Sequence, residues 1–305
     1  MKRKLVGLRF YFITIVGAMC WGLIGLFINP LYNYGFTPWD VVAIRGIFSF
    51  IILIIFMLIF HRDKLHTKLK DQLYFAGAGI LGIAFFNYFY FETFSKSSLS
   101  LAVTLLYTGP FFVLLLSRFF LKESLTVNKM LSLIFAIIGC AFVVGLIPFQ
   151  QANLSLHIIL TGIASGFCYA LYSIFSKPLT KRYDGVTITT YTFFYISIFM
   201  VFSSNLVQKT EKFQHPEVWL YVILLSLVGT VAGYIFYATG LKYLEASKAS
   251  ILTTIEPIVA ILAGILFLKE QLNYWQILGI ILIVFSVILI TYKQNEKKIA
   301  STTLL

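Results

Sequence analysis

Glu256 places a carboxyl group where this 305-residue chain is otherwise apolar. It lies about ten residues into the apolar stretch 246–268 and directly precedes Pro257. A charged side chain at the centre of a membrane-spanning helix costs on the order of 2.5–3.5 kcal/mol, so such residues are usually functional. A carboxyl group at that depth could bind a cationic substrate or take up and release a proton. The alternative is a structural carboxyl group that is hydrogen-bonded to a nearby hydroxyl or free backbone amide.

Two prolines interrupt apolar stretches at matching places, and each is predicted to kink its helix. Pro257 removes the hydrogen bond to the carbonyl of Thr253, and Pro110 removes the bond to the carbonyl of Leu106. Small residues share the helical face of Glu256, which favours close packing towards the interior of a helix bundle. These residues are Ala249, Thr253, Ala260 and Gly264.

Arg45 and Glu92 form a second candidate pair, because each lies within or at the end of an apolar stretch. They could form an ion pair that gates the outer side, or Arg45 could bind the carboxylate of a substrate. Two other interpretations stay open. Arg45 could extend its charged group to the membrane surface, and Lys96 could be the partner of Glu92 instead.

Aromatic and amide side chains are the other candidates for lining a substrate chamber. They stand out by their symmetry and spacing or by their closeness to the first proline. The candidates are Trp21, Asn87, Tyr90, Tyr107, Tyr169, Tyr172 and Tyr237. Together with Glu256 they would suit amino acids, aromatic metabolites or organic cations, the last through cation–π contacts. For each residue, packing within the core is the alternative.

Catalytic and metal-binding groups are missing from the interiors of the apolar stretches. All four aspartates and all four histidines lie in loops or near the ends of these stretches. The cysteines (Cys20, Cys140 and Cys168) show no metal-ligand spacing and are expected to be small buried apolar residues. The sequence also lacks a phosphate-binding loop of the ATPase type. We therefore expect no enzyme activity, no metal and no cofactor.

The composition explains why membrane-spanning helices must position these groups. The chain is 59% hydrophobic and 12% charged, whereas soluble domains are roughly 45–50% apolar and about 25% charged. A spanning helix is apolar all round for about 20 residues, because lipid offers no hydrogen-bonding partner to the backbone. We predict an all-α integral membrane protein with ten spans, at about 9–30, 39–60, 72–91, 97–121, 128–147, 155–177, 185–206, 217–239, 246–268 and 274–293.

The net charge of +12 is a topology signal rather than a sign of nucleic-acid binding. When the loops are assigned alternately to two sides, one side collects 19 of the 24 lysines and arginines and the other collects 4. Basic loops stay in the cytoplasm. We therefore expect a multi-pass protein of the cytoplasmic membrane with both termini in the cytoplasm and the link 148–154 outside.

The chain contains an internal repeat. Residues 107–125 and 254–272 both carry a proline early in an apolar run and end on Phe-Leu-Lys-Glu-x-Leu, with an offset of 147 residues. Residues 20–31 and 168–179 also match. A unit of five helices must invert in the membrane, so we predict inverted repeats at 1–150 and 151–305, the second with a short basic C-terminal tail. Glu256 corresponds to Gly109, which would leave space in the first copy.

Residues 246–290 resemble the C-terminal signature of the EamA-type branch of the drug/metabolite transporter superfamily, and residues 98–144 resemble the corresponding half. The signature combines a small-residue start, Glu-Pro, a run of aliphatic residues, Lys-Glu-x-Leu and a glycine in the last helix. The resemblance covers essentially the whole chain. It implies a ten-helix inverted-repeat carrier of small metabolites, which in this family is often an exporter.

The sequence therefore favours a secondary transporter that works by alternating access. Its substrate would be a small polar or amphipathic metabolite, such as an amino acid or a related compound, and export is the favoured direction. A coupling proton and the oligomeric state stay open. One alternative is an importer of choline or another quaternary ammonium compound. An alternative of another class is a membrane scaffold or sensor subunit that transports nothing.

Overall fold

The computed structural model describes residues 2–97, 99–146, 155–269 and 271–292. Three features discussed above lie outside the described residues: the link 148–154, Glu270 and the basic C-terminal tail. The described chain is all helical, and nine of its helices are long and apolar enough to cross a membrane. The tenth expected span is the shorter apolar helix Val127–Val143. The predicted fold class is thus confirmed.

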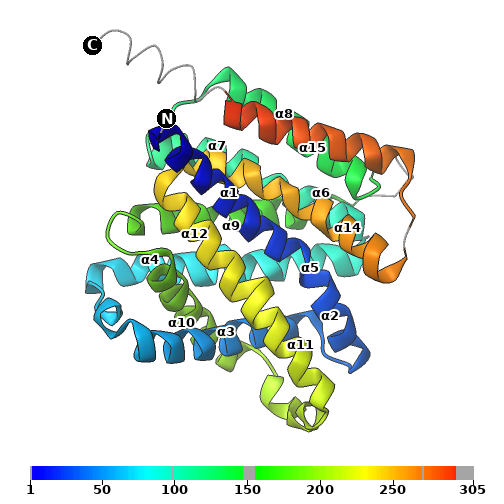
Figure 1. The fold of residues 1–305 in the computed structure, drawn as a ribbon. Helices are drawn as coiled ribbons and strands as arrows, with labels where there is room; N and C mark the ends of the chain where they lie inside the picture. The colour runs from blue at the N-terminus through cyan, green and yellow to red at the C-terminus, as the bar shows by residue number, and fades with distance from the viewer. Residues whose placement is uncertain (1, 98, 147–154, 270, 293–305) are drawn as a thin grey trace.

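The helices are named along the chain in Figure 1. Residues before the link form α1 (Lys2–Gly22), α2 (Ile24–Asn33), α3 (Pro38–Phe60), α4 (Gln72–Ala76), α5 (Phe85–Lys96), α6 (Leu99–Leu106), α7 (Gly109–Phe120) and α8 (Val127–Val143). Residues after it form α9 (Leu156–Leu179), α10 (Gly185–Ser203), α11 (Pro216–Ser226), α12 (Gly233–Tyr243), α13 (Ala246–Leu252), α14 (Glu256–Leu268) and α15 (Tyr274–Tyr292). Short 3₁₀ segments cover Arg62–Leu65, Leu69–Asp71, Leu206–Gln214 and Thr253–Ile255, and π-helical segments cover Gly77–Ala84 and Leu227–Ala232.

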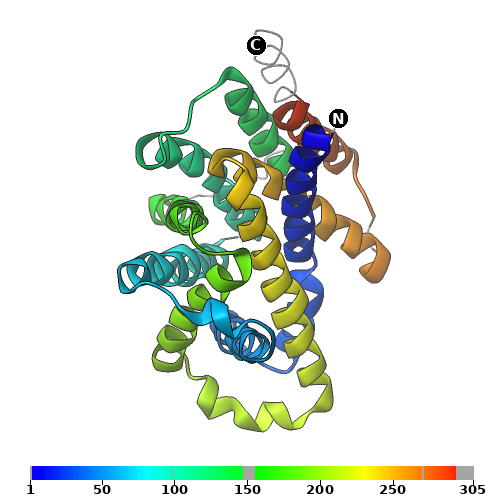
Figure 2. The ribbon, with the colours of Figure 1, turned by 60° about the vertical axis from the view of Figure 1, so that its left-hand side comes forward.

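Helices from the two halves of the chain pack against each other throughout the bundle. Helix α1 lies along α12, α3 lies along α10, and α9 packs against α5 and α7. Helices α8 and α15 form a pair at the edge of the bundle, as Figures 1 and 2 show. Glycines allow their backbones to approach closely: a Cβ atom on Gly279 would lie only 2.6 Å from the carbonyl oxygen of Gly139.

Both predicted kinks fall at breaks between helices. Helix α6 ends at Leu106 and α7 begins at Gly109, so that Pro110 occupies the first turn of α7. In the second half, the 3₁₀ segment Thr253–Ile255 separates α13 from α14, and Pro257 occupies the first turn of α14. A proline is tolerated in a first turn because its missing N–H would have no partner there.

Other local features recur at corresponding places in the two halves. The π-helical segments Gly77–Ala84 and Leu227–Ala232 interrupt the third and eighth spans. Lys122 and Lys269, from the two Lys-Glu motifs, both have a φ angle of 58°. Left-handed backbone is uncommon for a lysine, and at these positions it ends a helix. These features support the repeat, while its boundaries at 1–150 and 151–305 and its in-plane axis stay predictions.

The connecting segments gather at two ends of the bundle. At one end, Lys64 pairs with Asp184 across 2.7 Å, and the ring of Phe10 stacks on that of Tyr243 with centroids 3.6 Å apart. The first contact joins the connections after α3 and α9, and the second joins the start of α1 to the end of α12. Lys177 Nζ near the end of α9 donates to the carbonyl of Leu241 in α12 over 2.6 Å, so all four segments lie at the same end. The sequence assigns these segments to the basic side.

At the other end, the connection before α11 covers the start of α3. Lys212 Nζ donates to the carbonyl oxygen of Gly35 over 2.6 Å, and Lys209 pairs with Asp40. The two groups of loops match the alternation used in the charge count. Which group faces the cytoplasm stays a prediction.

Candidate functional site

The first turn of α14 presents the carboxyl group of Glu256 to the interior of the bundle. The side chain is half-buried. Among the described residues it has no hydrogen-bond or ion-pair partner, although it lies within electrostatic range of Arg45 on α3. It also lies within electrostatic range of Tyr90, Tyr107 and Tyr169. Three of the predicted tyrosines, from three helical regions, thus lie in the neighbourhood of the carboxyl group.

Tyr169 fixes one wall of this site. Its hydroxyl is 3.0 Å from Thr253 Oγ1, immediately before α14. A Cβ atom on Gly109 would lie 2.7 Å from Tyr169 Cδ1, and one on Gly166 would lie 2.4 Å from Thr108 Oγ1. Helix α9 can therefore cross the α6–α7 break only because glycines stand there. The space expected beside Gly109 is filled by the Tyr169 ring.

Arg45 forms the opposite wall. Its Nε donates to Thr230 Oγ1 over 3.1 Å, and the Tyr234 hydroxyl lies within electrostatic range of its charge. Thr230 belongs to the second π-helical segment, where its hydroxyl donates to the carbonyl of Leu225 over 2.9 Å. Such segments are frequent at functional sites because they offset the side chains that follow. Here the π-helical segment brings a hydroxyl to the guanidinium group.

Asn87 lies beside Arg45 at a small cavity. Its Nδ2 donates to the carbonyl oxygen of Ile83 in the first π-helical segment over 2.8 Å. The cavity has room for about one water molecule. It is lined by Val42, Arg45, Gly46, Ile83, Asn87, Phe193 and Ile196. Both π-helical segments therefore flank the arginine.

The remaining aromatic candidates pack into one cluster next to Arg45. The ring of Trp21 lies 5.0 Å from Tyr234 and 5.3 Å from Tyr237, and Tyr172 lies 5.1 Å from Tyr234. The hydroxyl of Tyr237 is 2.7 Å from Ser173 Oγ. Trp21 Nε1 is buried and has no hydrogen-bond partner in the described part of the chain. These residues form a cluster of aromatic rings that carry hydroxyl and indole N–H groups but no charge.

The structure does not bring Arg45 and Glu92 together. Glu92 forms an ion pair with Lys96 over 2.5 Å within one helix, which is the alternative that the sequence left open. A spacing of four residues places these two side chains on neighbouring turns of the same face. The carboxyl group within electrostatic range of Arg45 is instead that of Glu256.

Two residues of this site are missing from the sequence prediction. Thr230 gives no sequence signal, because only the π-helical offset turns it towards Arg45. Tyr234 could have been found, since it lies three residues before Tyr237 and so shares its helical face. Both rings contact Trp21.

The arrangement can hold opposite charges at once. A guanidinium group offers several N–H donors in one plane to a carboxylate, and Arg45 uses its Nε–H on Thr230. A carboxylate and the faces of tyrosine rings attract an ammonium group. A molecule that carries both charges would complement both walls.

Known proteins resemble this chain in sequence and in fold. The profile of the EamA-like transporter family matches residues 8–145 and 156–292. An uncharacterized transporter of Archaeoglobus fulgidus is 28% identical over 269 residues, which cover 87% of this chain and 90% of the relative. The uncharacterized transporter YyaM of Bacillus subtilis is 26% identical over 267 residues, which cover 84% of this chain and 86% of the relative. A crystal structure matches 92% of this chain and 96% of its own with a TM-score of 0.75 and 16% identity, which shows likeness of fold.

Proposed function

Since the chain belongs to the EamA-like transporter family, we propose that it exports a small zwitterionic metabolite, such as an amino acid or a related compound, across the cytoplasmic membrane by alternating access. Family membership confirms the resemblance seen in the sequence. It also makes the chain a multi-pass membrane transporter of a small molecule, and not an enzyme. The substrate, the direction and the mechanism are our proposal.

The observation that carries this proposal is the separation of two opposite charges inside one bundle. Glu256 lacks a partner among the described residues, while Arg45 donates to the neutral hydroxyl group of Thr230. Two charges left in a low-dielectric interior without a direct ion pair are costly. A zwitterion that entered between them would give each wall a charged partner, which supports a substrate with both a carboxylate and an ammonium group.

Counterflow in proteoliposomes tests the proposal. Vesicles loaded with unlabelled amino acids should accumulate the corresponding labelled compound, and Arg45→Met should abolish this accumulation because the carboxylate loses its partner. The substitution Glu92→Gln is the control, since Glu92 forms an exposed ion pair with Lys96. Equal counterflow by the Arg45→Met variant and the unaltered protein would contradict a zwitterionic substrate.

The same variant separates the second candidate function. The tyrosines around Glu256 favour an importer of choline or another quaternary ammonium compound. A permanent cation would gain from the loss of the Arg45 charge. Labelled choline should then exchange faster in the Arg45→Met variant than in the unaltered protein. Exchange of neither class of compound would favour the scaffold or sensor alternative.

A further inference from the structure

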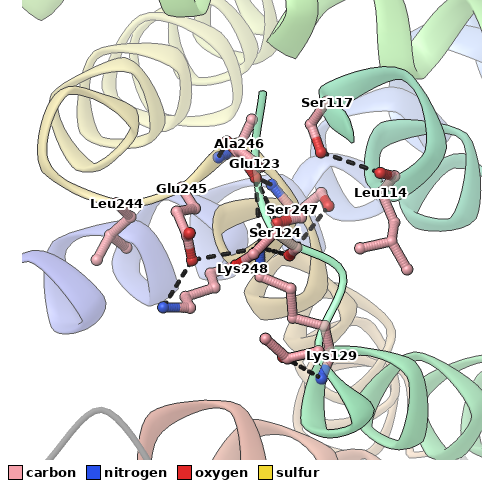
Figure 3. A network of polar contacts seen from close by, with 12 residues as sticks. Leu114, Ser117, Glu123, Ser124, Lys129, Leu244, Glu245, Ala246, Ser247 and Lys248 are labelled. Carbon is pink, nitrogen blue, oxygen red and sulfur yellow. Dashed lines mark hydrogen bonds and ion pairs between the residues drawn. The ribbon is translucent and has the colours of Figure 1, made fainter. Parts of the chain in front are cut away.

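A cluster of buried charges outside the proposed site joins the two halves of the chain. It lies at the end of the bundle that carries the basic loops, and Figure 3 shows it from close by. Glu123 is 8% exposed and Lys129 is 1% exposed, although both carry charge. Charges buried to this degree are stable only when they are paired and hydrogen-bonded. Glu123 and Lys129 lie between α7 and α8 or at the start of α8, and their partners come from the turn between α12 and α13.

Glu123 binds the start of α13. Its carboxylate accepts hydrogen bonds from the backbone N–H of Ala246 over 2.6 Å, from the N–H of Ser247 over 3.2 Å and from the Ser247 hydroxyl. The left-handed conformation of Lys122 turns the chain back, so that the Glu123 N–H also reaches the carbonyl of Ser117 over 3.1 Å. The side chain is therefore aimed at α13 by the local backbone of the Lys-Glu motif.

Lys129, near the start of α8, contacts both turns. Its Nζ lies 2.8 Å from the carbonyl of Ser124, 3.6 Å from Glu123 and 3.3 Å from Glu245. Glu245 is also paired with Lys248 over 2.7 Å. Burial alone would raise the pKa of Glu245, but Lys248 and Lys129 together hold it below its usual value. The Glu245 carboxylate thus stays charged while the turn between α7 and α8 contacts the turn between α12 and α13.

We propose that the contact of Glu123 with Ala246 and Ser247, which we call the Glu123 latch, closes this end of the bundle and opens during transport. The inference rests on the proposed alternating access, because the two turns belong to opposite halves and must separate when this end opens. Charged and hydrogen-bonded groups can be hydrated when they part, whereas an apolar contact would expose apolar surface to water. The latch is therefore suited to repeated breaking and closure.

The substitution Ser250→Cys, beneath the Glu123 latch, reports the state of the latch without any substrate. Ser250 is fully buried one turn beyond Ser247, so it can carry the label in a variant whose three native cysteines are replaced by alanine. Labelling by a membrane-impermeant maleimide is measured in right-side-out and in inside-out vesicles. Glu123→Gln keeps the acceptor oxygen but removes the charge. We expect its labelling rate to rise about fivefold or more in one orientation, as a shift towards the open state requires.

The controls separate a latch from a structural cap. Glu92→Gln removes a carboxylate from an exposed ion pair and should leave the labelling rate unchanged. Ser247→Ala removes only the hydroxyl donor, so we expect a smaller increase of about twofold in its labelling rate. This variant replaces Glu123→Gln in the test if Glu123→Gln does not fold. An unchanged rate in folded Glu123→Gln, or in Ser247→Ala when the former is unfolded, overturns the latch. Counterflow of the unaltered protein is measured separately, so a lack of substrate exchange would overturn the proposed function but not the labelling result.

Discussion

At the scale of single residues, the proposed site depends on two charged groups that the protein does not pair with each other. Arg45 donates a hydrogen bond to Thr230, while Glu256 lies near tyrosines that cannot neutralise it. Only the second copy of the sequence repeat carries this carboxyl group, because the position that corresponds to Glu256 in the first copy is Gly109. A substrate would therefore meet a carboxylate on one half of the scaffold only.

Glu256→Gln should keep the protein folded and inserted in the membrane while abolishing substrate binding or its pH dependence. The carboxamide preserves shape and hydrogen bonding but deletes the charge and the titration. The measurement is uptake into proteoliposomes between about pH 5.5 and pH 8.5, a range in which a perturbed carboxyl group can titrate. Glu92→Gln serves as the control. Overlapping profiles of Glu256→Gln and the unaltered protein would assign Glu256 to structure.

Gly109→Ala should weaken the wall that carries Tyr169. The added Cβ atom would meet Tyr169 Cδ1 at 2.7 Å and the Gly166 carbonyl oxygen at 3.2 Å, so the ring must move away from Thr253. Overpacking of this kind costs about 1–3 kcal/mol. We expect a lower midpoint of thermal unfolding and slower counterflow.

Gly25→Ala is the matched control for this substitution, because an added Cβ atom there meets nothing within 4 Å. It should leave both the unfolding midpoint and counterflow close to those of the unaltered protein. If both alanine variants behaved alike, the close approach of α9 to the α6–α7 break would carry no energetic weight.

At the scale of the elements, the breaks in the helices place the functional groups. The 3₁₀ segment before α14 frees the first turn in which Glu256 lies, and the π-helical segments bring Thr230 and Asn87 to Arg45. A regular helix would turn these side chains to other faces. The connections between elements then hold the helices in register through ion pairs.

Asp184→Asn should remove the charge between two connections while keeping the cap of α10. Asp184 accepts the Thr187 N–H over 2.9 Å, and asparagine is an equally good N-cap. Burial alone would raise the pKa of Asp184, but the hydrogen bond from Lys64 and the cap hold it below its usual range. Because the folded pKa is lowered, this stabilisation is present above the unfolded pKa of about 3.9 and is lost as the pH falls through the folded value.

The expected effect of Asp184→Asn is small, since partly exposed ion pairs contribute about 0.2–1 kcal/mol. Thermal unfolding in detergent at pH 7 should show a slightly lower midpoint. The difference should shrink as the pH falls below the unfolded pKa of about 3.9 and vanish once the carboxylate of the folded, unaltered protein is protonated. Asp63→Asn, at an exposed neighbouring position, is the control. A difference that persists at low pH would mean that the cap, not the charge, is affected.

The spans and kinks could be predicted because lipid and proline constrain the backbone locally. Apolar runs must form helices in a membrane, and Pro110 and Pro257 must interrupt them. The contacts of Arg45 with Thr230 and of Glu123 with Ala246 could not be predicted. Each joins residues that are more than a hundred positions apart, and no local rule fixes which faces of two helices meet.

At the scale of the whole molecule, the ion pairs and the charge distribution divide the loops in the same way. The connections after α3, α9 and α12 meet at one end of the bundle, and the segment before α11 covers the start of α3 at the other. Alternating access requires that these ends face different compartments. The orientation then decides on which side the Glu123 latch opens.

The charge count predicts that the end carrying 19 of the 24 basic residues faces the cytoplasm. Single cysteines test this in a variant whose native cysteines are replaced, because Asp63 and Gln208 are exposed at opposite ends. In intact cells, an impermeant maleimide should label a cysteine at Gln208 and spare one at Asp63. The positions should exchange behaviour in inside-out vesicles, which controls for differences in intrinsic reactivity. Labelling of Asp63→Cys but not Gln208→Cys in intact cells would invert the topology, and the Glu123 latch would then control the outer opening.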